Sequence, residues 1–381
     1  MRFSLPILKK KEERFLTLDI GTEAVKALIF QKENEKIIIF GASLEYFDRF
    51  GVFDSKDFEK DVIKKTISKA LQNFAPQNFG RVLLGLPATI LKGRVIFQNF
   101  CRENPKEIIK EKEEGEILEQ VLKEGKGKIA QKFAENSDIL AEDIHFINLK
   151  ILEIKIDGYE IPILRGYQGK NLDFRILATF LPKYYLKNIE DIVQARGFKN
   201  LKIVQEAEGL TSIFKNYSDG IFLDLGGRIT QIFLVKNGKL EEIGEFEIGG
   251  ETFSQILSQN LGLKEEEARV FKEKYSEGLF SVEVRKRIRE IFSEEVENWF
   301  QSLKLKLRNQ KILPSTIFLF GGGSLLPEIP KILEKGNWQS FPFIPQPKIK
   351  LFLPKNLKNI EDRTESLNSP QDIAPLLFCL S

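Results

Sequence analysis

The stretch FLTLDIGTEAVKALIF, residues 15–30, decides how the rest of the chain is interpreted. An apolar run ends in Asp19-Ile20-Gly21-Thr22 and a second apolar run follows at once, which predicts two buried strands joined by a tight turn. The stretch IFLDLGGRITQIFLV, residues 221–235, has the same arrangement in the second half of the chain. Both place an aspartate, an apolar residue and a glycine at the first turn of a predicted three-stranded meander. The pattern therefore indicates an internal repeat of a long supersecondary unit.

The composition is that of an ordinary folded protein. The 381 residues allow two or three domains with a sizeable core, and 42% are hydrophobic. The 58 basic and 55 acidic residues nearly balance at a net charge of +3, so nothing in the composition calls for a nucleic-acid partner. One histidine, His145, and two cysteines, Cys101 and Cys379, exclude a multi-histidine metal site and a disulfide framework. A Ser-His-Asp site is a poor hypothesis for the same reason, and His145 is expected to be structural.

The apolar segments are all short. None approaches the ~20 residues of a membrane-spanning helix. Residues 1–14 are expected to form a flexible tail. The two cysteines, too few for a disulfide framework, fit a reducing, cytoplasmic compartment.

The first half of the chain predicts strands, a helix and a charged insertion. Strands are expected at 15–20, 25–31, 36–46 and 81–86, with a helix at 56–74, which gives the order βββαβ. The highly charged residues 103–137 predict a solvated amphipathic helix, broken at Gly125-Lys126-Gly127. Residues 144–180 alternate as strands, and residues 187–196 predict a helix that ends at Gly197.

The second half begins with the repeated meander, whose second turn is the hairpin pair Asn237-Gly238. Helices are expected at 253–260, 265–275 and 282–309. A buried strand then runs directly into Gly321-Gly322-Gly323-Ser324 and a further helix. Residues 342–368 are expected to be loop-like, and the chain closes with a short helix.

The glycine-rich turns carry the chemistry. Backbone N–H groups in such turns bind phosphate oxygens, because glycine permits close approach. Asp19 and Asp224, one from each meander, are expected to face each other across a cleft and to hold Mg²⁺ through its water shell. The groups expected around the phosphates are Gly21, Gly226, Gly227, the hydroxyls of Thr22 and Thr230, and Lys26. Lys26 could equally lie on the solvent face.

The third glycine turn, residues 321–324, is expected to lie flat against an adenine or ribose, with a helix N-terminus adding a positive dipole end. Each turn alone is more simply an ordinary tight turn, in which the aspartate caps its own hairpin. Three such turns in this order, each after an apolar strand, favour a split nucleotide site. The chain has neither a P-loop nor a Rossmann fingerprint.

The three turns resemble the phosphate-1, phosphate-2 and adenosine motifs of the actin-like ATPase superfamily. Within it, the chain resembles the FtsA/PilM branch from about residue 15 onward. The segment INLKILEIKIDGYEIPILRGYQGKNLDFRILATF, residues 147–180, is similar to the SHS2-type subdomain IC of that branch. The segments QEAEGL, FGGGSLLPEIP and DIAPLL resemble the first connecting, adenosine and second connecting motifs.

This resemblance implies an α/β, two-domain actin-like ATPase (ribonuclease H-like) fold with an inserted α+β subdomain. The implied division is a tail at 1–14, subdomain IA at 15–90 and 184–205, subdomain IC at 91–183, and domain II at 206–381 with IIB helices at about 250–310. It further implies that Glu206 positions water near the γ-phosphate and that Gly249, Gly250 and Lys272 approach the nucleotide. Two departures stand out: Arg228 replaces a glycine common in relatives, which argues against fast hydrolysis, and Arg269 replaces a glutamate.

The function implied by resemblance is an ATP- and Mg²⁺-binding scaffold with at most slow ATPase activity. An FtsA-like protein would link FtsZ, through its C-terminal tail, to the bacterial cell division machinery and would polymerise with itself. A PilM-like protein would instead grip the cytoplasmic peptide of a PilN-like membrane protein in type IV pilus assembly. A small-molecule kinase is the third alternative, against which the inserted subdomain shows no acid-lined sugar site. The FtsA-type membrane anchor is expected to be absent, so association with the inner face of the membrane would be indirect, through partners.

Overall fold

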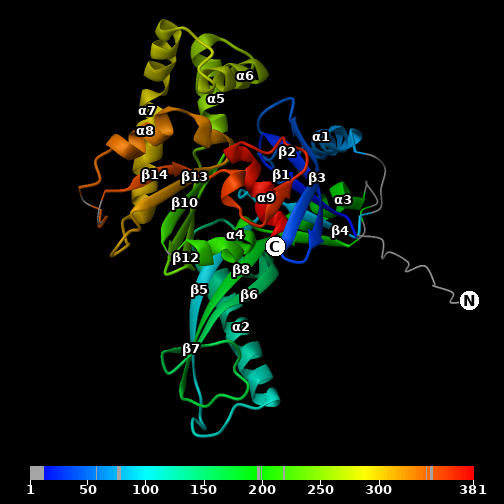
Figure 1. Ribbon diagram of the computed structural model, residues 1–381, viewed down its shortest axis with the longest axis vertical. Helices are drawn as coiled ribbons and strands as arrows, with labels where there is room; N and C mark the ends of the chain where they lie inside the picture. Colours follow the sequence, from blue (N-terminus) through cyan, green and yellow to red (C-terminus); the bar gives the residue numbers. More distant parts are fainter. Residues whose placement is uncertain are drawn as a thin grey trace, which may run out of the picture.

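The computed structural model describes residues 13–56, 58–74, 79–194, 198, 200–217, 219–339, 341–343 and 346–381. The expected tail therefore lies outside the described residues apart from its last two positions, and so does the expected helix end at Gly197. Three sheets organise the described chain. Figure 1 shows two of them side by side, with the third in a lobe that projects below. In the parts of the chain that are described, no helix is both long and apolar enough to cross a membrane.

The first sheet has the order β15-β3-β2-β1-β4-β9. Its strands are β1 (Phe15–Ile20), β2 (Ala24–Glu33), β3 (Lys36–Tyr46), β4 (Arg81–Gly85), β9 (Leu201–Val204) and β15 (Ile360–Asp362). The strand β1 pairs antiparallel with β2 and parallel with β4, and α1 (Lys60–Gln72) connects β3 to β4. The predicted order βββαβ is confirmed.

The second sheet repeats this topology, with the order β12-β11-β10-β13-β14. Its strands are β10 (Gly220–Leu225), β11 (Thr230–Lys236), β12 (Lys239–Phe246), β13 (Thr316–Phe320) and β14 (Lys348–Leu351). In both sheets a meander is followed by a parallel strand beside its first strand, so the predicted internal repeat is confirmed. Asn237 and Gly238, at φ 53° and 70°, form the predicted tight turn.

The third sheet and one long helix form the lower lobe. Its order is β5-β8-β6-β7, with β5 (Lys92–Cys101), β6 (Ile144–Ile156), β7 (Tyr159–Ile161) and β8 (Asn171–Pro182). The helix α2 (Glu111–Ala134) packs on this sheet through Ile117, Val121 and Ile129. The predicted break at residues 125–127 is wrong, because α2 runs through it unbroken. Gly125 lets α2 approach β5 closely, since a Cβ atom there would lie 2.6 Å from Ile96 Cδ1.

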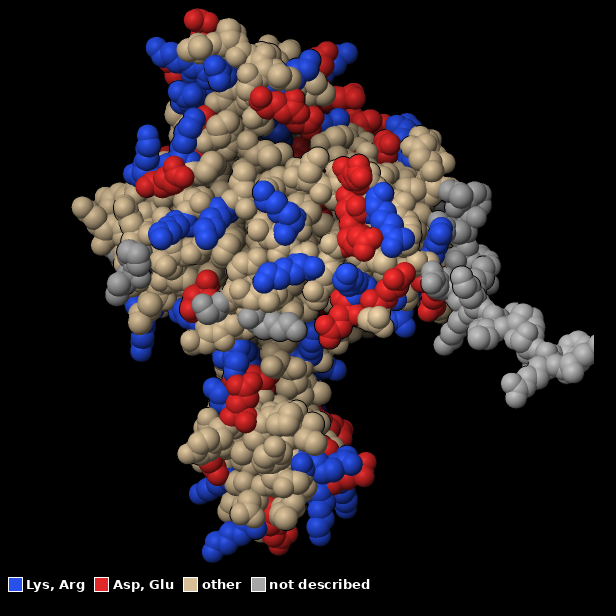
Figure 2. All heavy atoms as spheres, in the orientation of Figure 1, with Lys and Arg blue, Asp and Glu red and all other residues tan. Residues whose placement is uncertain are grey.

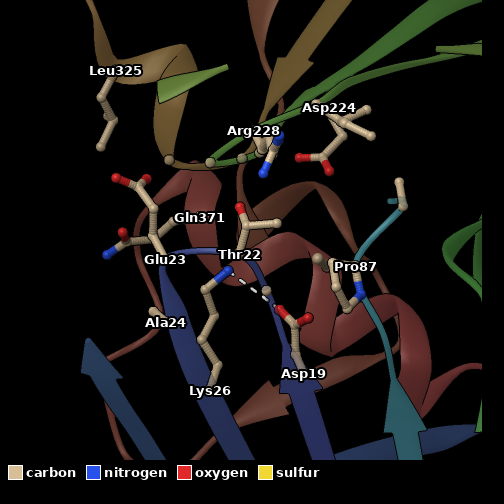
Figure 3. Close-up of a pocket in the computed structure, with 18 of the residues that line it drawn as sticks. Asp19, Thr22, Glu23, Ala24, Lys26, Pro87, Asp224, Arg228, Leu325 and Gln371 are labelled. Carbon is tan, nitrogen blue, oxygen red and sulfur yellow. Dashed lines mark hydrogen bonds and ion pairs between the residues drawn. The ribbon is translucent and has the colours of Figure 1, made fainter. Parts of the chain in front are cut away.

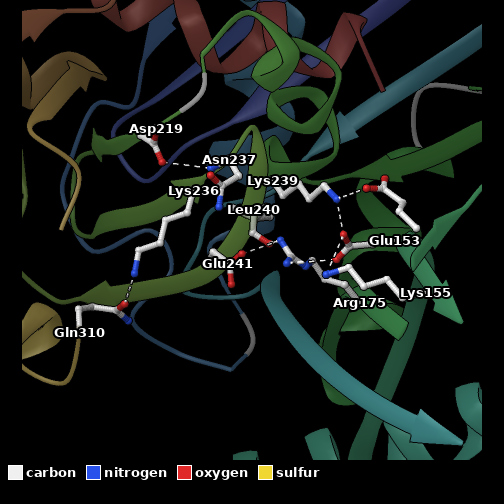
Figure 4. A network of polar contacts seen from close by, with 11 residues as sticks. Glu153, Lys155, Arg175, Asp219, Lys236, Asn237, Lys239, Leu240, Glu241 and Gln310 are labelled. Atoms are coloured by element: carbon white, nitrogen blue, oxygen red, sulfur yellow. Dashed lines mark hydrogen bonds and ion pairs between the residues drawn. The ribbon is translucent and has the colours of Figure 1, made fainter. Parts of the chain in front are cut away.

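Ion pairs join this lobe to the second sheet. Glu245 of β12 accepts from Lys92 Nζ at 2.7 Å and from Arg94 Nη2 at 3.1 Å, both on β5. Figure 4 shows a second group, in which Arg175 and Lys239 converge on Glu153 of β6. The lobe is thus inserted in the sequence of the first half, and ion pairs hold it against β12 of the second half.

The remaining helices cover the two main sheets, and part of the core is common to both. They are α3 (Tyr184–Gln194), α4 (Glu206–Ile213), α5 (Gly250–Leu261), α6 (Glu265–Ser276), α7 (Val282–Leu307), α8 (Glu328–Lys335) and α9 (Ile373–Cys379). One hydrophobic cluster contains Phe30 of the first sheet, Phe222 of the second, Leu210 of α4 and Leu377 of α9. The helices α4 and α9 therefore lie in a core shared by the two halves.

The structure corrects two further sequence interpretations. Residues 342–368, expected to be loop-like, contain β14 and β15, which add parallel strands to the two main sheets. The third glycine turn leads into a short 3₁₀ helix at 322–325, and α8 begins only at Glu328. No α-helix N-terminus therefore lies directly after the glycines. Figure 2 shows Lys and Arg interspersed with Asp and Glu over the face in view.

Candidate functional site

The first turns of the two meanders face each other. Asp19 and Asp224 each stand next to the last residue of their strand, β1 and β10. Across the gap, Thr22 Oγ1 lies 2.4 Å from where a Cβ atom at Gly227 would be, so only glycine fits opposite the first turn. Between the halves lies a cavity of about 440 Å³, a size typical of ligand sites. Figure 3 shows the labelled side chains of both halves around it.

Most of the predicted site residues line this cavity. They are Asp19, Gly21, Thr22, Lys26, Glu206, Asp224, Gly226, Gly227, Lys272, Gly321 and Gly322. The structure does not bring Thr230, Gly249, Gly250, Gly323 or Ser324 to its lining. The assigned roles of all these residues remain predictions.

A buried charge cluster occupies the centre of the cavity. Lys26 Nζ lies 3.3 Å from Asp19 Oδ2, because β1 and β2 pair these residues in register. Burial opposes the charge of Lys26, but Asp19 and Asp224 outweigh it and raise the Lys26 pKa. Burial raises the Asp224 pKa to about 7. Burial, followed by the charges of Asp224 and Asp19, raises the Glu206 pKa well above its ordinary value.

The donor set fits a divalent cation bound through water. Of the residues that the structure describes, six acids and three bases line the cavity: Asp19, Glu23, Glu206, Asp224, Glu273 and Glu277, against Lys26, Arg228 and Lys272. Glu206 Oε2 and Asp224 Oδ1 are buried without a hydrogen-bond partner. Within the described chain, no cluster of three or more acidic, histidine or cysteine side chains could hold a metal directly. Oxygen ligands acting through retained water are the way in which Mg²⁺ is usually held.

The hydroxyl of Thr230 makes its hydrogen bonds inside the protein and does not line the cavity. Its hydroxyl donates to the carbonyl of Ile248 at 2.7 Å and accepts from the indole of Trp299 at 2.9 Å. Strand alternation explains this, because Asp224 pairs with Gln231 and cross-strand partners share a face. Gln231 therefore lines the cavity and Thr230 does not.

The glycines at the start of α5 have a packing reason of their own. The N–H of Gly250 donates to the carbonyl of Gly226 at 2.9 Å, so it is already satisfied. A Cβ atom at Gly249 would lie 2.4 Å from the carbonyl oxygen of Gly227. These glycines let α5 begin directly against the glycine turn at residues 226–227.

The third glycine turn closes the other side of the cavity. Gly321 has φ 81°, and a Cβ atom there would lie 2.2 Å from Asp224 Oδ1, so the position demands glycine. Ser324 is buried, and its hydroxyl donates to the carbonyl of Gly321 at 2.7 Å. Ser324 thus stabilises the glycine turn by a hydrogen bond on the side away from the cavity.

Arg269 connects α6 to the first half of the chain. Its Nη1 donates to the carbonyl of Phe47 at 2.9 Å, and its guanidinium lies 4.4 Å from the centre of the Tyr46 ring. Nearby, the N–H of Phe50 donates to Glu265 at 2.9 Å. Arg269 therefore holds the two halves together beside the cavity.

Arg228 also reaches across the halves. It lines the cavity and forms an ion pair with Asp54. The charge of Arg228 is thus partly balanced by an acid of the first half.

The sequence interpretation missed several residues at the cavity. Glu23 lies at the tip of the first turn, Tyr46 at the end of β3, and Glu273 on α6. Residues 86–89 follow β4 and also line it. The position of 86–89 after a buried parallel strand beside β1 was a usable signal, since neighbouring parallel strands end at one edge of a sheet.

A scan against models of known protein families found no match. Among curated proteins, cell division protein FtsA of Streptococcus pneumoniae serotype 2 is 23% identical over 353 residues, covering 85% of this chain and 74% of that protein. FtsA of Staphylococcus epidermidis (strain RP62A) is 24% identical over 276 residues, 71% of this chain and only 56% of that protein. Among solved structures, the "PilM-PilN type IV pilus biogenesis complex" contains a similar chain, with a TM-score of 0.69, 14% identity, and coverage of 97% of this chain and 98% of that one.

The fold is therefore that of the actin-like ATPases, which confirms the predicted α/β, two-domain class. In sequence the chain is similar to FtsA, and in structure it is similar to a chain of the PilM-PilN complex.

Proposed function

We propose that this protein binds ATP with Mg²⁺ in the cavity between its halves and acts as an FtsA-like scaffold that links FtsZ to the division machinery. One observation carries the binding site: the two aspartate turns of the duplicated sheets face each other around a cavity with unpaired buried oxygens. Asp19 and Asp224 would hold Mg²⁺ through water, and the ion would supply positive charge against the phosphates. The assignment of FtsZ follows from the curated relatives named FtsA.

The proposed scaffold has at most slow ATPase activity. Burial and the charges of Asp224 and Asp19 raise the pKa of Glu206, the residue proposed to position water, which favours its protonated form in the ligand-free protein. A protonated carboxylic acid accepts a proton from water poorly, which disfavours fast hydrolysis. Lys272 and the glycine turns would bind phosphate oxygens and orient them.

The four-part division predicted from the sequence is also proposed here, with the third sheet and α2 as the inserted partner-binding subdomain. As an FtsA-like or PilM-like scaffold, the protein would be cytoplasmic and would reach the inner face of the membrane through its partners.

A PilM-like role is the second candidate. The similar chain in the PilM-PilN complex is covered almost completely, whereas FtsA of S. epidermidis is covered over 56% of its length. In this role the protein would hold the cytoplasmic peptide of a PilN-like membrane protein.

Two binding experiments test these proposals. Fluorescent ATP should bind the protein in the presence of Mg²⁺, and Asp19→Asn or Asp224→Asn should abolish Mg²⁺-dependent binding without unfolding the chain. Unchanged affinity in both variants would show that the turns are wrongly assigned. Labelled FtsZ C-terminal tail and PilN-like N-terminal tail, both from the protein's own genome, should then be titrated with Mg²⁺-ATP present. Capture of the FtsZ tail supports the division role, and capture of the PilN-like tail supports the pilus role.

A further inference from the structure

Glu23 occupies a corner of the cavity that is otherwise shaped for an anion. Gly227 and Lys272 line this corner, and Gly250 lies next to Lys272. Glu23 Oε2 lies 3.1 Å from where a Cβ atom at Gly227 would be and 3.4 Å from the same point at Gly250. Lys272 Nζ lies 3.5 Å from Glu23 Oε1 and donates to the carbonyl of Gly250 at 2.7 Å. Figure 3 shows Glu23 pointing from the first turn into the cavity.

The carboxylate of Glu23 is poorly satisfied there. Its side chain is only 16% exposed, and Oε1 has no hydrogen-bond partner. A second acid, Glu251, lies close by, and after burial the charge of Glu23 is the largest cause that raises the Glu251 pKa, to about 7. A buried carboxylate with one cation and one acid beside it is held at an electrostatic disadvantage.

The corner combines the features that bind phosphate oxygens. The glycine turn at 226–227 allows close approach of the backbone, and Lys272 supplies a point charge. The carboxylate of Glu23 is an anion held in this corner by its own side chain, so it occupies the place that a phosphate oxygen would take. The two anions cannot share one lysine without strong repulsion.

We propose that Glu23 sets the affinity and the cation requirement of the nucleotide site, by filling the Gly227–Gly250–Lys272 corner as an internal anion that a polyphosphate must displace. This inference rests on the proposed nucleotide-binding function. The ligand class is a di- or triphosphate, and Mg²⁺ offsets the repulsion between its charge and Glu23. Removing the charge of Glu23 should therefore tighten polyphosphate binding most when Mg²⁺ is absent.

A purely structural role for Glu23 predicts the opposite result. If its ion pair only holds Lys272 in place, Glu23→Gln loosens the lysine and weakens polyphosphate binding. The two roles therefore differ in the sign of the change in affinity.

The experiment is isothermal titration of the full chain with ADP and with inorganic pyrophosphate, each with Mg²⁺ and with EDTA. Glu23→Gln keeps the shape and removes the charge, and Glu23→Ala removes both. Glu277→Gln, at an exposed residue that directly follows α6 and lines the same cavity, measures the general effect of removing one acid. Both Glu23 variants should bind about tenfold tighter or more in EDTA, with a smaller gain in Mg²⁺, and Glu277→Gln should gain much less.

Each other outcome has a definite meaning. Wild-type binding with equal or weaker binding by both Glu23 variants overturns the inference and leaves the nucleotide site standing. Binding by the Glu23 variants alone supports the inference in its strongest form. If no folded variant binds either ligand under any condition, the proposed function fails and this inference fails with it. Tryptophan fluorescence at each titration temperature shows that the variants are folded.

Discussion

Replacing Glu245 by glutamine should destabilise the protein by about 3 kcal/mol at pH 7, because this carboxylate joins the lower lobe to the second sheet. Its side chain is 14% exposed and accepts from Lys92 and Arg94. Burial opposes its charge, but the two cations outweigh burial and lower its pKa from 4.5 to about 2. Each unit of pKa difference corresponds to about 1.4 kcal/mol, which gives the figure of about 3 kcal/mol.

The pH dependence follows from the sign of this shift. A lowered pKa in the folded state contributes stability that is fully present above 4.5 and is lost as pH falls through about 2. At pH 3 about 1 kcal/mol of the contribution should remain. The difference between wild type and Glu245→Gln should therefore shrink to less than half between pH 7 and pH 3.

Urea unfolding followed by tryptophan fluorescence measures this difference. Both tryptophans, Trp299 and Trp338, lie in the core beneath the second sheet, so they report on the half that carries Glu245. Glu247→Gln, at an exposed position just after β12, is the matched control and should change stability by less than about 0.5 kcal/mol. A Glu245→Gln protein as stable as wild type at pH 7, or a gap that does not shrink in acid, would refute the reasoning.

Three further results are expected. Gly209→Ala should lower stability by about 2 kcal/mol or more, seen as a lower Tm, since its Cβ atom would lie 2.0 Å from the carbonyl oxygen of Leu377 on α9. The ligand-free protein should lose stability as pH rises from about 4 towards 7, because the Asp224 pKa is raised from 3.8 to about 7 in the folded state; Asp224→Asn should flatten this dependence and raise the Tm at pH 8. Arg269→Ala removes a charged hydrogen bond between the halves and should release bound nucleotide roughly tenfold faster or more in stopped-flow measurements; an unchanged rate would mean that this contact does not limit opening.

The meanders were predictable because their signal is local. Alternating apolar runs with glycine turns located β1, β2, β3 and β10 to within a few residues. The missed strands β14 and β15 are four and three residues long, and they exist because each pairs with a strand far away in sequence. Such short segments carry too little pattern to be recognised before their partners are placed.

At the cavity, position in a motif was a weaker guide than strand register. Lys26 was expected on either face, and the pairing with Asp19 places it inside. Thr230 was expected at the phosphates, whereas the same rule of shared faces places Gln231, and not Thr230, in the cavity lining. The glycine break predicted in α2 failed for a related reason, because Gly125 serves a tertiary contact with β5 rather than a turn.

The core shared through α9 bears on the order in which the protein is made. The residues of α4 and of both main sheets that pack against α9 all precede it in the chain. On the ribosome, where domains fold in the order of their synthesis, the strands of both meanders can pair before α9 emerges. Docking of α9, which completes the core shared by the two halves, therefore comes late in synthesis, after the strands of both meanders have been made.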